Sequence, residues 1–506
     1  MSRSFRPLSN LRLLPLTLAV AFALQAQQAN AEHAPPKTSP EATVVEHSND
    51  VFAADPQYEN KPYSDEAELK IYGGKFAVQT PRPLLELGRP IYQSGPLKRS
   101  GTAFGLKNPV DQAFSIYGDM RTGFARNDTG DKRTSQVAAR LNLEVDYKLT
   151  ATERVHAFFR PLDNNTEFTR CELGSNASGC TGKFDFKTDA LFFEGDLAAM
   201  LAGATGKDQN FDMAVAAGKM PLLFQNGVWM EDVITGVAAT LPAKNSAALG
   251  ISNMDVTFFG GTDASSAGVR GNDAEKSVLF KKSNVYGVTT FIEANEGYWE
   301  LGYAYTDAPA GFADRSYHNL GMAFTRRYGG WLSNSVRVVH NFGQKLDSGA
   351  APTAAGTLLL IENSFVTSLP STLVPYLNVF YGSDHPQSVS RAVDAGGILK
   401  NVGINFETDG LTGFPKLTDN ANNMWGGALG LEYLFSLNQQ LVFEVATTQP
   451  MGLASNRTLV GSEVAFGARY QRPLDKAWIF RADAMMANRS NNTDISGIRF
   501  ELRRKF

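Results

Sequence analysis

The sequence predicts an all-β fold, a transmembrane antiparallel β-barrel of about 16–18 strands with a short N-terminal extension. Three observations lead to this prediction. They are an export signal at the N-terminus, repeated alternation of apolar and polar residues, and connections that alternate between short and long. The 506 residues include Gly 46, Phe 33 and Tyr 16, a composition that suits strands, tight turns and interfacial aromatic rings.

Residues 1–31 have the parts of a secretory signal peptide. Three arginines precede an apolar run from Leu13 to Leu24, and Ala29-Asn30-Ala31 offers a small-residue cleavage site. A membrane anchor is the weaker alternative, because the apolar run is too short to span a bilayer as a helix. Cleavage removes no acidic residue and makes the formal net charge of −3 more negative, which gives no sign of nucleic acid as a partner.

The mature chain divides into three regions. Residues 32–68 are rich in proline, alanine and acids without a sustained period, and we expect a flexible segment. Residues 69–109 carry five prolines, which forbid long regular structure. This second region is either a plug inside the barrel or an irregular periplasmic extension. Residues 110–506 are the predicted barrel.

The stretch VAARLNLEVDYKL, residues 137–149, shows the alternation most clearly. Its odd positions are apolar, and nearly all of its even positions are polar or charged. A helical period of 3.6 does not account for this pattern, whereas a strand places the two sets on opposite faces. The pattern recurs in the segments 114–124, 155–160, 299–306, 332–338, 429–433, 441–445, 466–470 and 478–486.

The segments run for about ten or more residues, which is longer than globular strands and matches a tilted crossing of a bilayer. Short links such as EANEG and RPLDK alternate with long polar ones, among them the segment from Ser383 to Asn423, which we expect to form an outer loop. Transmembrane barrels have short periplasmic turns and long outer loops. The apolar residues that alternate along each strand are therefore predicted to face lipid.

If the apolar residues of each strand face lipid, the alternate residues line a water-filled lumen. Many of these alternate residues are charged. Arginines and carboxylates occur in similar number, which would orient polar solutes in a pore. Most such charges in a wide barrel pair with one another, so each single residue is better explained as structural than as selective. The predicted pore-lining residues are Asp119, Arg121, Arg140, Glu144, Asp146, Arg160, Arg337, Glu432, Glu444, Arg469, Arg481 and Asp483.

The segment PLLFQNGVWMED, residues 221–232, is a candidate constriction loop. Phe224 and Trp229 are costly to leave in water, and a loop folded into the lumen would bury them. The alternative, which the frequency of aromatic belts favours, is an outer turn with interfacial aromatic residues.

Cys171 and Cys180 are the only cysteines, and they lie in a polar stretch of an exported chain. An oxidising compartment favours a disulfide between them. Free thiols or a partial metal site are the alternatives, although two thiols without a nearby histidine are a poor zinc site. We expect no metal and no cofactor.

Two stretches resemble known families. The C-terminal SGIRFELRRKF, which ends in Phe506, resembles the assembly signal of Gram-negative outer-membrane β-barrel proteins, although Arg504 stands where that signal usually has an apolar residue. The stretch from Phe211 to Val237 looks like a strand, turn and aromatic loop of alginate-export-like and substrate-selective porins. The resemblance implies a location in the cell outer membrane, with membrane lipid and the barrel assembly machinery as partners.

No enzyme motif is present, since G-x-S-x-G, G-x-G-x-x-G and H-E-x-x-H are all missing. We therefore expect no enzymatic activity and predict a porin, a channel for passive diffusion of small polar or anionic solutes. A conduit for polysaccharide export or for a hydrophobic nutrient is the alternative. A homo-oligomer is left open.

Overall fold

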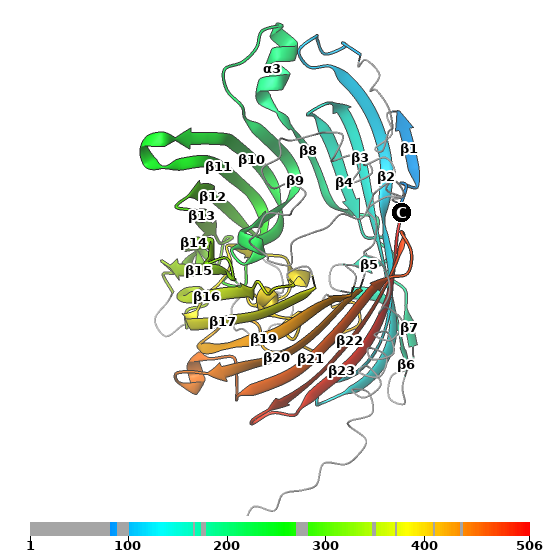
Figure 1. Ribbon diagram of the computed structural model, residues 1–506, viewed down its shortest axis with the longest axis vertical. Helices are drawn as coiled ribbons and strands as arrows, with labels where there is room; N and C mark the ends of the chain where they lie inside the picture. The colour runs from blue at the N-terminus through cyan, green and yellow to red at the C-terminus, as the bar shows by residue number, and fades with distance from the viewer. Residues whose placement is uncertain are drawn as a thin grey trace, which may run out of the picture.

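The computed structural model describes residues 81–88, 101–164, 167–173, 179–269, 282–346, 351–369, 372–407, 410–435 and 439–506. The strands form one closed antiparallel barrel of 18 strands (Figure 1). This confirms the predicted fold class and the strand range. The predicted signal peptide and the segment 32–68 lie outside the described residues.

Each strand of the wall pairs with the next one along the chain, and the barrel closes where the last strand pairs with the first. Sixteen of the eighteen wall positions are single strands. They are β2 (Val110–Asp128), β3 (Arg133–Thr150), β9 (Ala214–Phe224), β10 (Met230–Ser246), β11 (Ile251–Ser265), β12 (Lys282–Ala294), β13 (Gly297–Asp307), β14 (Tyr317–Tyr328), β15 (Leu332–Phe342), β16 (Ala355–Phe365), β17 (Leu373–His385), β19 (Met424–Phe435), β20 (Gln439–Pro450), β21 (Glu463–Pro473), β22 (Trp478–Arg489) and β23 (Ile495–Lys505).

The remaining two wall positions are each built from two pieces. β4 (Arg154–Phe159) and β6 (Glu167–Leu173) both pair with β3, while β7 (Gly179–Thr181) pairs with β6 and β8 (Thr188–Asp196) pairs with β4. The short β5 (Asp163–Asn164) lies between the two pieces of the first position. Residues 167–173 and 179–181 thus form a pair of antiparallel strands within a mostly polar stretch of the sequence.

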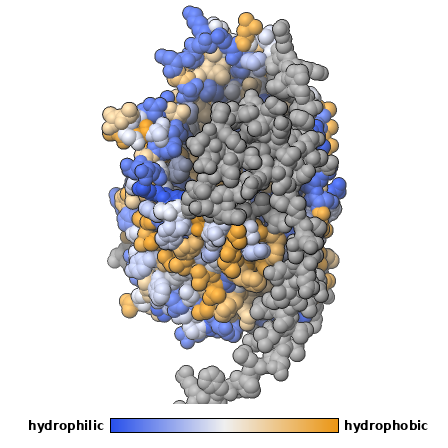
Figure 2. Space-filling view, in the orientation of Figure 1, coloured by the Kyte–Doolittle hydropathy of each residue, from blue (hydrophilic) through white to orange (hydrophobic). Residues whose placement is uncertain are grey.

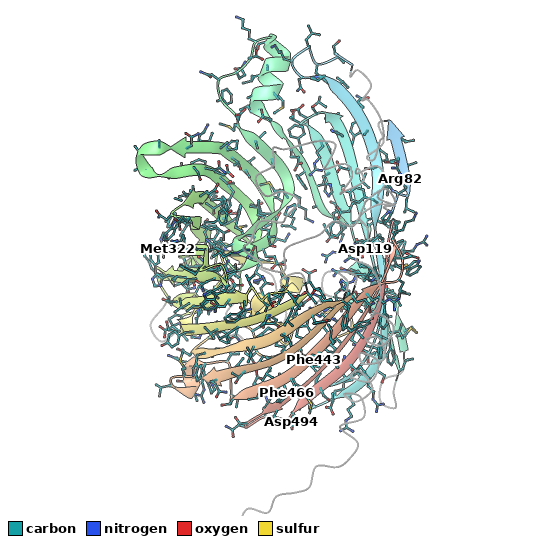
Figure 3. The ribbon with its side chains drawn as sticks, viewed as in Figure 1. Arg82, Asp119, Met322, Phe443, Phe466 and Asp494 are labelled. Carbon is teal, nitrogen blue, oxygen red and sulfur yellow. A yellow bond between two sulfur atoms is a disulfide. The ribbon has the colours of Figure 1, made fainter. Side chains whose placement is uncertain are left out.

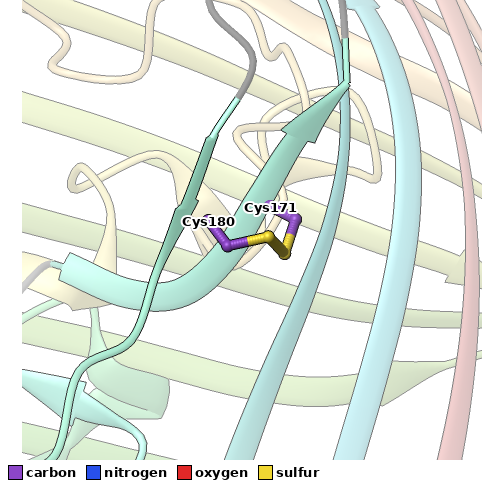
Figure 4. Close-up of a disulfide and its surroundings, with 2 residues drawn as sticks. All are labelled: Cys171 and Cys180. Atoms are coloured by element: carbon purple, nitrogen blue, oxygen red, sulfur yellow. A yellow bond between two sulfur atoms is a disulfide. The ribbon is translucent and has the colours of Figure 1, made fainter.

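The two cysteines lie opposite each other in that pair of strands. Cys171 of β6 and Cys180 of β7 form a disulfide with an S–S distance of 2.08 Å (Figure 4). The bond joins the two strands close to the loop that connects them.

The seam of the barrel joins the two ends of the chain. β23 pairs with β2 from Asp119 to Asp128, and the backbone of Phe506 exchanges hydrogen bonds of 2.8 and 3.0 Å with Gly118. β1 (Leu85–Gly88) pairs with β2 from Ala113 to Ile116, beyond the point where the C-terminus stops. This part of the segment 69–109 therefore extends the sheet. Much of the rest lies outside the described residues, so the plug stays a prediction.

Side chains alternate across the wall as the sequence predicted. Large apolar residues stand exposed on the outer face, including Met322 (46% exposed), Phe443 (42%) and Phe466 (47%). Figure 2 shows apolar side chains gathered over β19–β22, with hydrophilic ones above and below. In Figure 3, Met322 lies on the outer side of the wall, whereas Asp119 of β2 lies toward the enclosed space.

Most turns at one rim are short, but the β8–β9 connection contains the helix α3 (Leu197–Thr205). Asp196 caps this helix by accepting a hydrogen bond of 2.7 Å from the Ala199 amide. None of the helices described is long and apolar enough to cross a membrane. The remaining helical segments are single 3₁₀ turns: η2 (Gln225–Gly227), η3 (Ala247–Leu249), η4 (Ala313–Arg315), η5 (Val393–Ala395), η6 (Lys400–Val402) and η7 (Ala454–Asn456).

The outer face can be tested at Met322, halfway along β14. We expect Met322→Arg to lower the free energy of unfolding in lipid vesicles by about 2–4 kcal/mol, because the guanidinium would enter hydrocarbon. Met322→Ala removes the same apolar side chain without adding charge and should cost less. Equal losses in urea titrations of the two variants would show that this face does not meet lipid.

Candidate functional site

The tip of the β9–β10 hairpin folds into the barrel. Trp229 is fully buried, and its Nε1 donates a hydrogen bond of 2.8 Å to Asn319 Oδ1 on β14. Its ring fills the space over Gly302 and Gly321, where any Cβ would lie within 2.6 Å of the indole. Phe224 packs against the indole ring. Trp229 is therefore no interfacial aromatic residue, whereas a constriction formed by this tip stays a prediction.

The segment 386–423, between β17 and β19, also folds into the barrel, and we call it the inner loop. Figure 1 shows its yellow coils enclosed by the strands. Its backbone continues the β9–β10 hairpin, because β18 (Ser390–Arg391) pairs with the start of β10 and the Val389 amide donates to the Trp229 carbonyl at 2.8 Å. The described residues of this predicted outer loop therefore lie inside the barrel and not above its rim.

The physical reason lies in the apolar residues of the inner loop. Leu399, Val402 and Phe406 are fully buried, within a cluster that includes inward residues of the wall. Polar residues dominate the inner loop, but its scattered apolar side chains are enough to bury the loop against the wall. Removing such side chains from water stabilises the infolded position by about 1.5–3 kcal/mol each.

Buried carboxylates of the wall hold the backbone of the inner loop. Glu444 of β20 accepts hydrogen bonds from the amides of Ile404 (2.8 Å) and Asn405 (2.9 Å). Glu463 of β21 accepts one from the amide of Thr418 at 2.9 Å. Charged acceptors of this kind make strong hydrogen bonds. Glu444, predicted to line the pore, does face inward but is covered by the inner loop.

Arginines gather on one side of the inner wall. The register places Arg503 of β23 opposite Arg121 of β2, and Arg121 opposite Arg140 of β3. Like charges directly opposite each other are destabilising unless carboxylates intervene. Further inward-facing arginines come from the neighbouring strands β21, β22 and β23. We call the whole set the arginine wall; its members are Arg121, Arg140, Arg469, Arg481, Arg499 and Arg503.

Carboxylates from two sources pair with the arginine wall. Some belong to the wall strands: Asp119 accepts from Arg503 Nη2 at 2.8 Å, and Glu501 accepts from Arg121 Nη2 at 2.6 Å. Asp483 is the third of these. Others come from segments folded into the lumen, namely Asp163 of β5 and Asp394 and Glu407 of the inner loop. The infolded segments thus neutralise arginines that the wall leaves in excess.

Asp394 ties the inner loop to the opposite wall. Its Oδ2 lies 3.3 Å from Arg140 Nη2 and also pairs with Arg160, which follows β4. Arg160 in turn holds Asp189 of β8, with 2.9 Å between Nη2 and Oδ1. Burial raises the pKa of Asp394, but the charges and hydrogen bonds of Arg160 and Arg140 outweigh it, so the pKa lies below the ordinary range.

The other predicted pore-lining residues fall into separate groups. Glu144 and Asp146 of β3 flank His156 of β4, with 2.6 Å between His156 Nε2 and Glu144 Oε2. Arg337 of β15 is 1% exposed and pairs with Glu362 at 2.7 Å, away from the arginine wall. Glu432 of β19 lines a cavity of about 320 Å³ beneath the inner loop.

Sequence reasoning left Arg503, Asp163, Asp394 and Glu407 out of the predicted pore-lining set. Arg503 lies on the inward parity of the last strand, so extending the alternation by one step would have found it. Asp394 and Glu407 belong to an irregular segment without any period, and nothing in the sequence indicates that they face arginines. No group of His, Cys, Asp and Glu suited to a metal ion occurs among the described residues.

The fold resembles that of solved channels. OccK1 (OpdK) of Pseudomonas aeruginosa is 12% identical with a TM-score of 0.51, and the match covers 78% of this chain and 98% of that one. OccAB4 of Acinetobacter baumannii is 9% identical with a TM-score of 0.50 and the same coverage. Both are outer-membrane porins with an 18-stranded barrel, and neither is of the alginate-export-like type.

At such low identity the likeness establishes the fold. No protein-family model matches the chain, and no curated protein matches it. The geometry of the site therefore has to carry any further conclusion about function.

The Asp394 contact gives a testable pH dependence. Because the folded pKa is lowered, its stabilisation is complete above the ordinary aspartate value of about 3.9 and is lost as the pH falls through the folded value. We expect inner-loop amides to stay protected from hydrogen exchange at pH 5 and to lose protection progressively as the pH falls below about 3.9.

Asp394→Asn should reproduce the loss at pH 7, weakening the anchor by about 1.5–3 kcal/mol. Asp475→Asn, in an exposed turn at the rim, serves as the control and should leave the inner loop protected. Unchanged exchange in Asp394→Asn would show that apolar burial alone fixes the inner loop.

Proposed function

We propose that this chain is an outer-membrane channel through which small polar solutes diffuse passively, with a preference for anions. The arginine wall is the observation that carries the proposal. Guanidinium groups on one side of an enclosed lumen offer charged hydrogen-bond donors to passing anions, and the carboxylates between them keep the groups in place. We also propose that the protein is assembled in the outer membrane.

Two infolded segments would set the size limit. The β9–β10 tip, with Phe224 and Trp229, and the inner loop share one packed cluster inside the barrel. An empty barrel of this strand number would leave a wide aqueous channel. The infolded segments narrow it, so the constriction we propose is the joint work of both rather than of the hairpin tip alone.

Carboxylates are the anions that the site suits best. A planar carboxylate accepts two parallel hydrogen bonds from one guanidinium, and the arginine wall already holds carboxylates from the protein in this way. OpdK, which has a similar fold, has been solved with vanillate, itself a carboxylate. A channel for a hydrophobic nutrient has less support, because the inward-facing apolar cluster is buried between the inner loop and the wall.

The test is ion conductance of the purified protein in planar lipid bilayers. We expect a stable current and a reversal potential that shows preference for chloride over potassium. Arg503→Gln should lower the anion-to-cation permeability ratio by about twofold, because it removes a charge and leaves Asp119 without its partner.

Arg504→Gln is the matched control. Arg504 is the next residue of β23 and lies on the outer face over Trp478, so its removal should leave the ratio unchanged. No current from the wild-type protein would contradict the channel itself, whereas equal effects of the two variants would contradict the role of the arginine wall.

A further inference from the structure

Glu407 of the inner loop reaches the arginine wall from the lumen. Its Oε2 lies 2.7 Å from Arg469 Nη1, and its Oε1 lies 3.7 Å from Arg481 Nη2. Its side chain is 35% exposed, against 13% for Arg469 and 15% for Arg481. The side chain of Glu407 is therefore more exposed than those of the two arginines it pairs with.

The arginines behind Glu407 have a second, fixed partner. Asp483 is 5% exposed and accepts from Nε of Arg469 (2.8 Å), Nε of Arg481 (2.9 Å) and Nη2 of Arg499 (2.8 Å). Asp483 thus holds all three guanidinium groups, independently of Glu407.

One hydrogen-bond donor of the cluster lacks an acceptor among the described residues. Arg481 Nη2 is buried and has no hydrogen-bond acceptor among the described residues, because Glu407 Oε1 is too distant for a hydrogen bond. A buried donor of this kind is destabilising until an acceptor reaches it. Glu407 therefore accepts a hydrogen bond from Arg469 but interacts with Arg481 only through its charge.

The cavity beneath the inner loop lies beside Glu407. Its volume is about 320 Å³, and Lys400, Asn401, Tyr376 and Asn378 line it together with Glu407. A space of this size holds a small organic acid. A solute in the cavity would thus meet Glu407 on one side, with Arg469 and Arg481 directly behind it.

We propose that Glu407 is a built-in competitor at a carboxylate-binding site formed by Arg469 and Arg481. A small organic carboxylate that enters the cavity displaces the Glu407 carboxylate and takes its place on the two guanidinium groups. This inference rests on the proposed function and gives it a substrate class and a regulating residue.

The contacts of Glu407 distinguish it from the other inward glutamates. Glu444 and Glu463 hold backbone amides of the inner loop and cannot leave without releasing it. Glu407 contacts only arginine side chains among the described residues, and Asp483 keeps those in position. The displaced Glu407 carboxylate stays beside the cavity and repels the incoming carboxylate, so binding is weak and reversible, as passage through a channel requires.

The experiment measures block of the potassium chloride current by benzoate in planar bilayers. We expect Glu407→Gln to lower the benzoate concentration that halves the current by about tenfold, because a neutral amide competes poorly for guanidinium. Arg481→Gln in the Glu407→Gln background should abolish this gain. Benzamide, the neutral analogue, should block no variant more than wild type.

Glu362→Gln is the matched control, since Glu362 is also an inward glutamate paired with an arginine. Its partner Arg337 is 1% exposed, so no solute reaches it, and benzoate block should change by less than about twofold. An equal gain in both variants, or none in Glu407→Gln, would overturn the inference while the channel still conducts. Loss of all current in the wild type would instead overturn the proposed function.

Discussion

The pairing of β23 with β2 is the interaction on which the rest of the structure depends. A membrane offers no water to an unpaired strand edge, so every backbone N–H and C=O of the wall must find its partner within the sheet. The seam runs from Asp119 to Asp128, and Phe506 and β1 extend it along the same edge of β2. Closure fixes which side chains face lipid and which face the lumen.

Closure also creates the arginine wall. Arg121 and Glu501 lie 380 residues apart in the chain and form an ion pair across the seam. Neither end of the chain carries enough arginines to make one face of the lumen basic. The seam brings β21, β22 and β23 beside β2 and β3, and the charges then share one surface. Asp394 and Glu407, supplied by the inner loop, complete the neutralisation.

The inner loop shows how a polar segment comes to occupy a lumen. Its few apolar residues pack against the wall, while Glu444 and Glu463 satisfy backbone amides that would otherwise be buried without acceptors. The carboxylates of the wall therefore have two roles. Some hold backbone, and others hold guanidinium groups. The sequence alone does not distinguish these roles, because both kinds of residue lie on the inward parity of a strand.

The sequence by itself determined the alternation, and with it the barrel, its approximate strand number and the inward side of residues such as Asp119 and Arg469. These follow from local chain geometry, because side chains on a strand point to opposite faces in turn. Only the tertiary structure decided which inward residues meet. The neighbours of Arg121 depend on closure between the chain ends, and the positions of Glu407 and Trp229 depend on irregular segments that pack against distant strands.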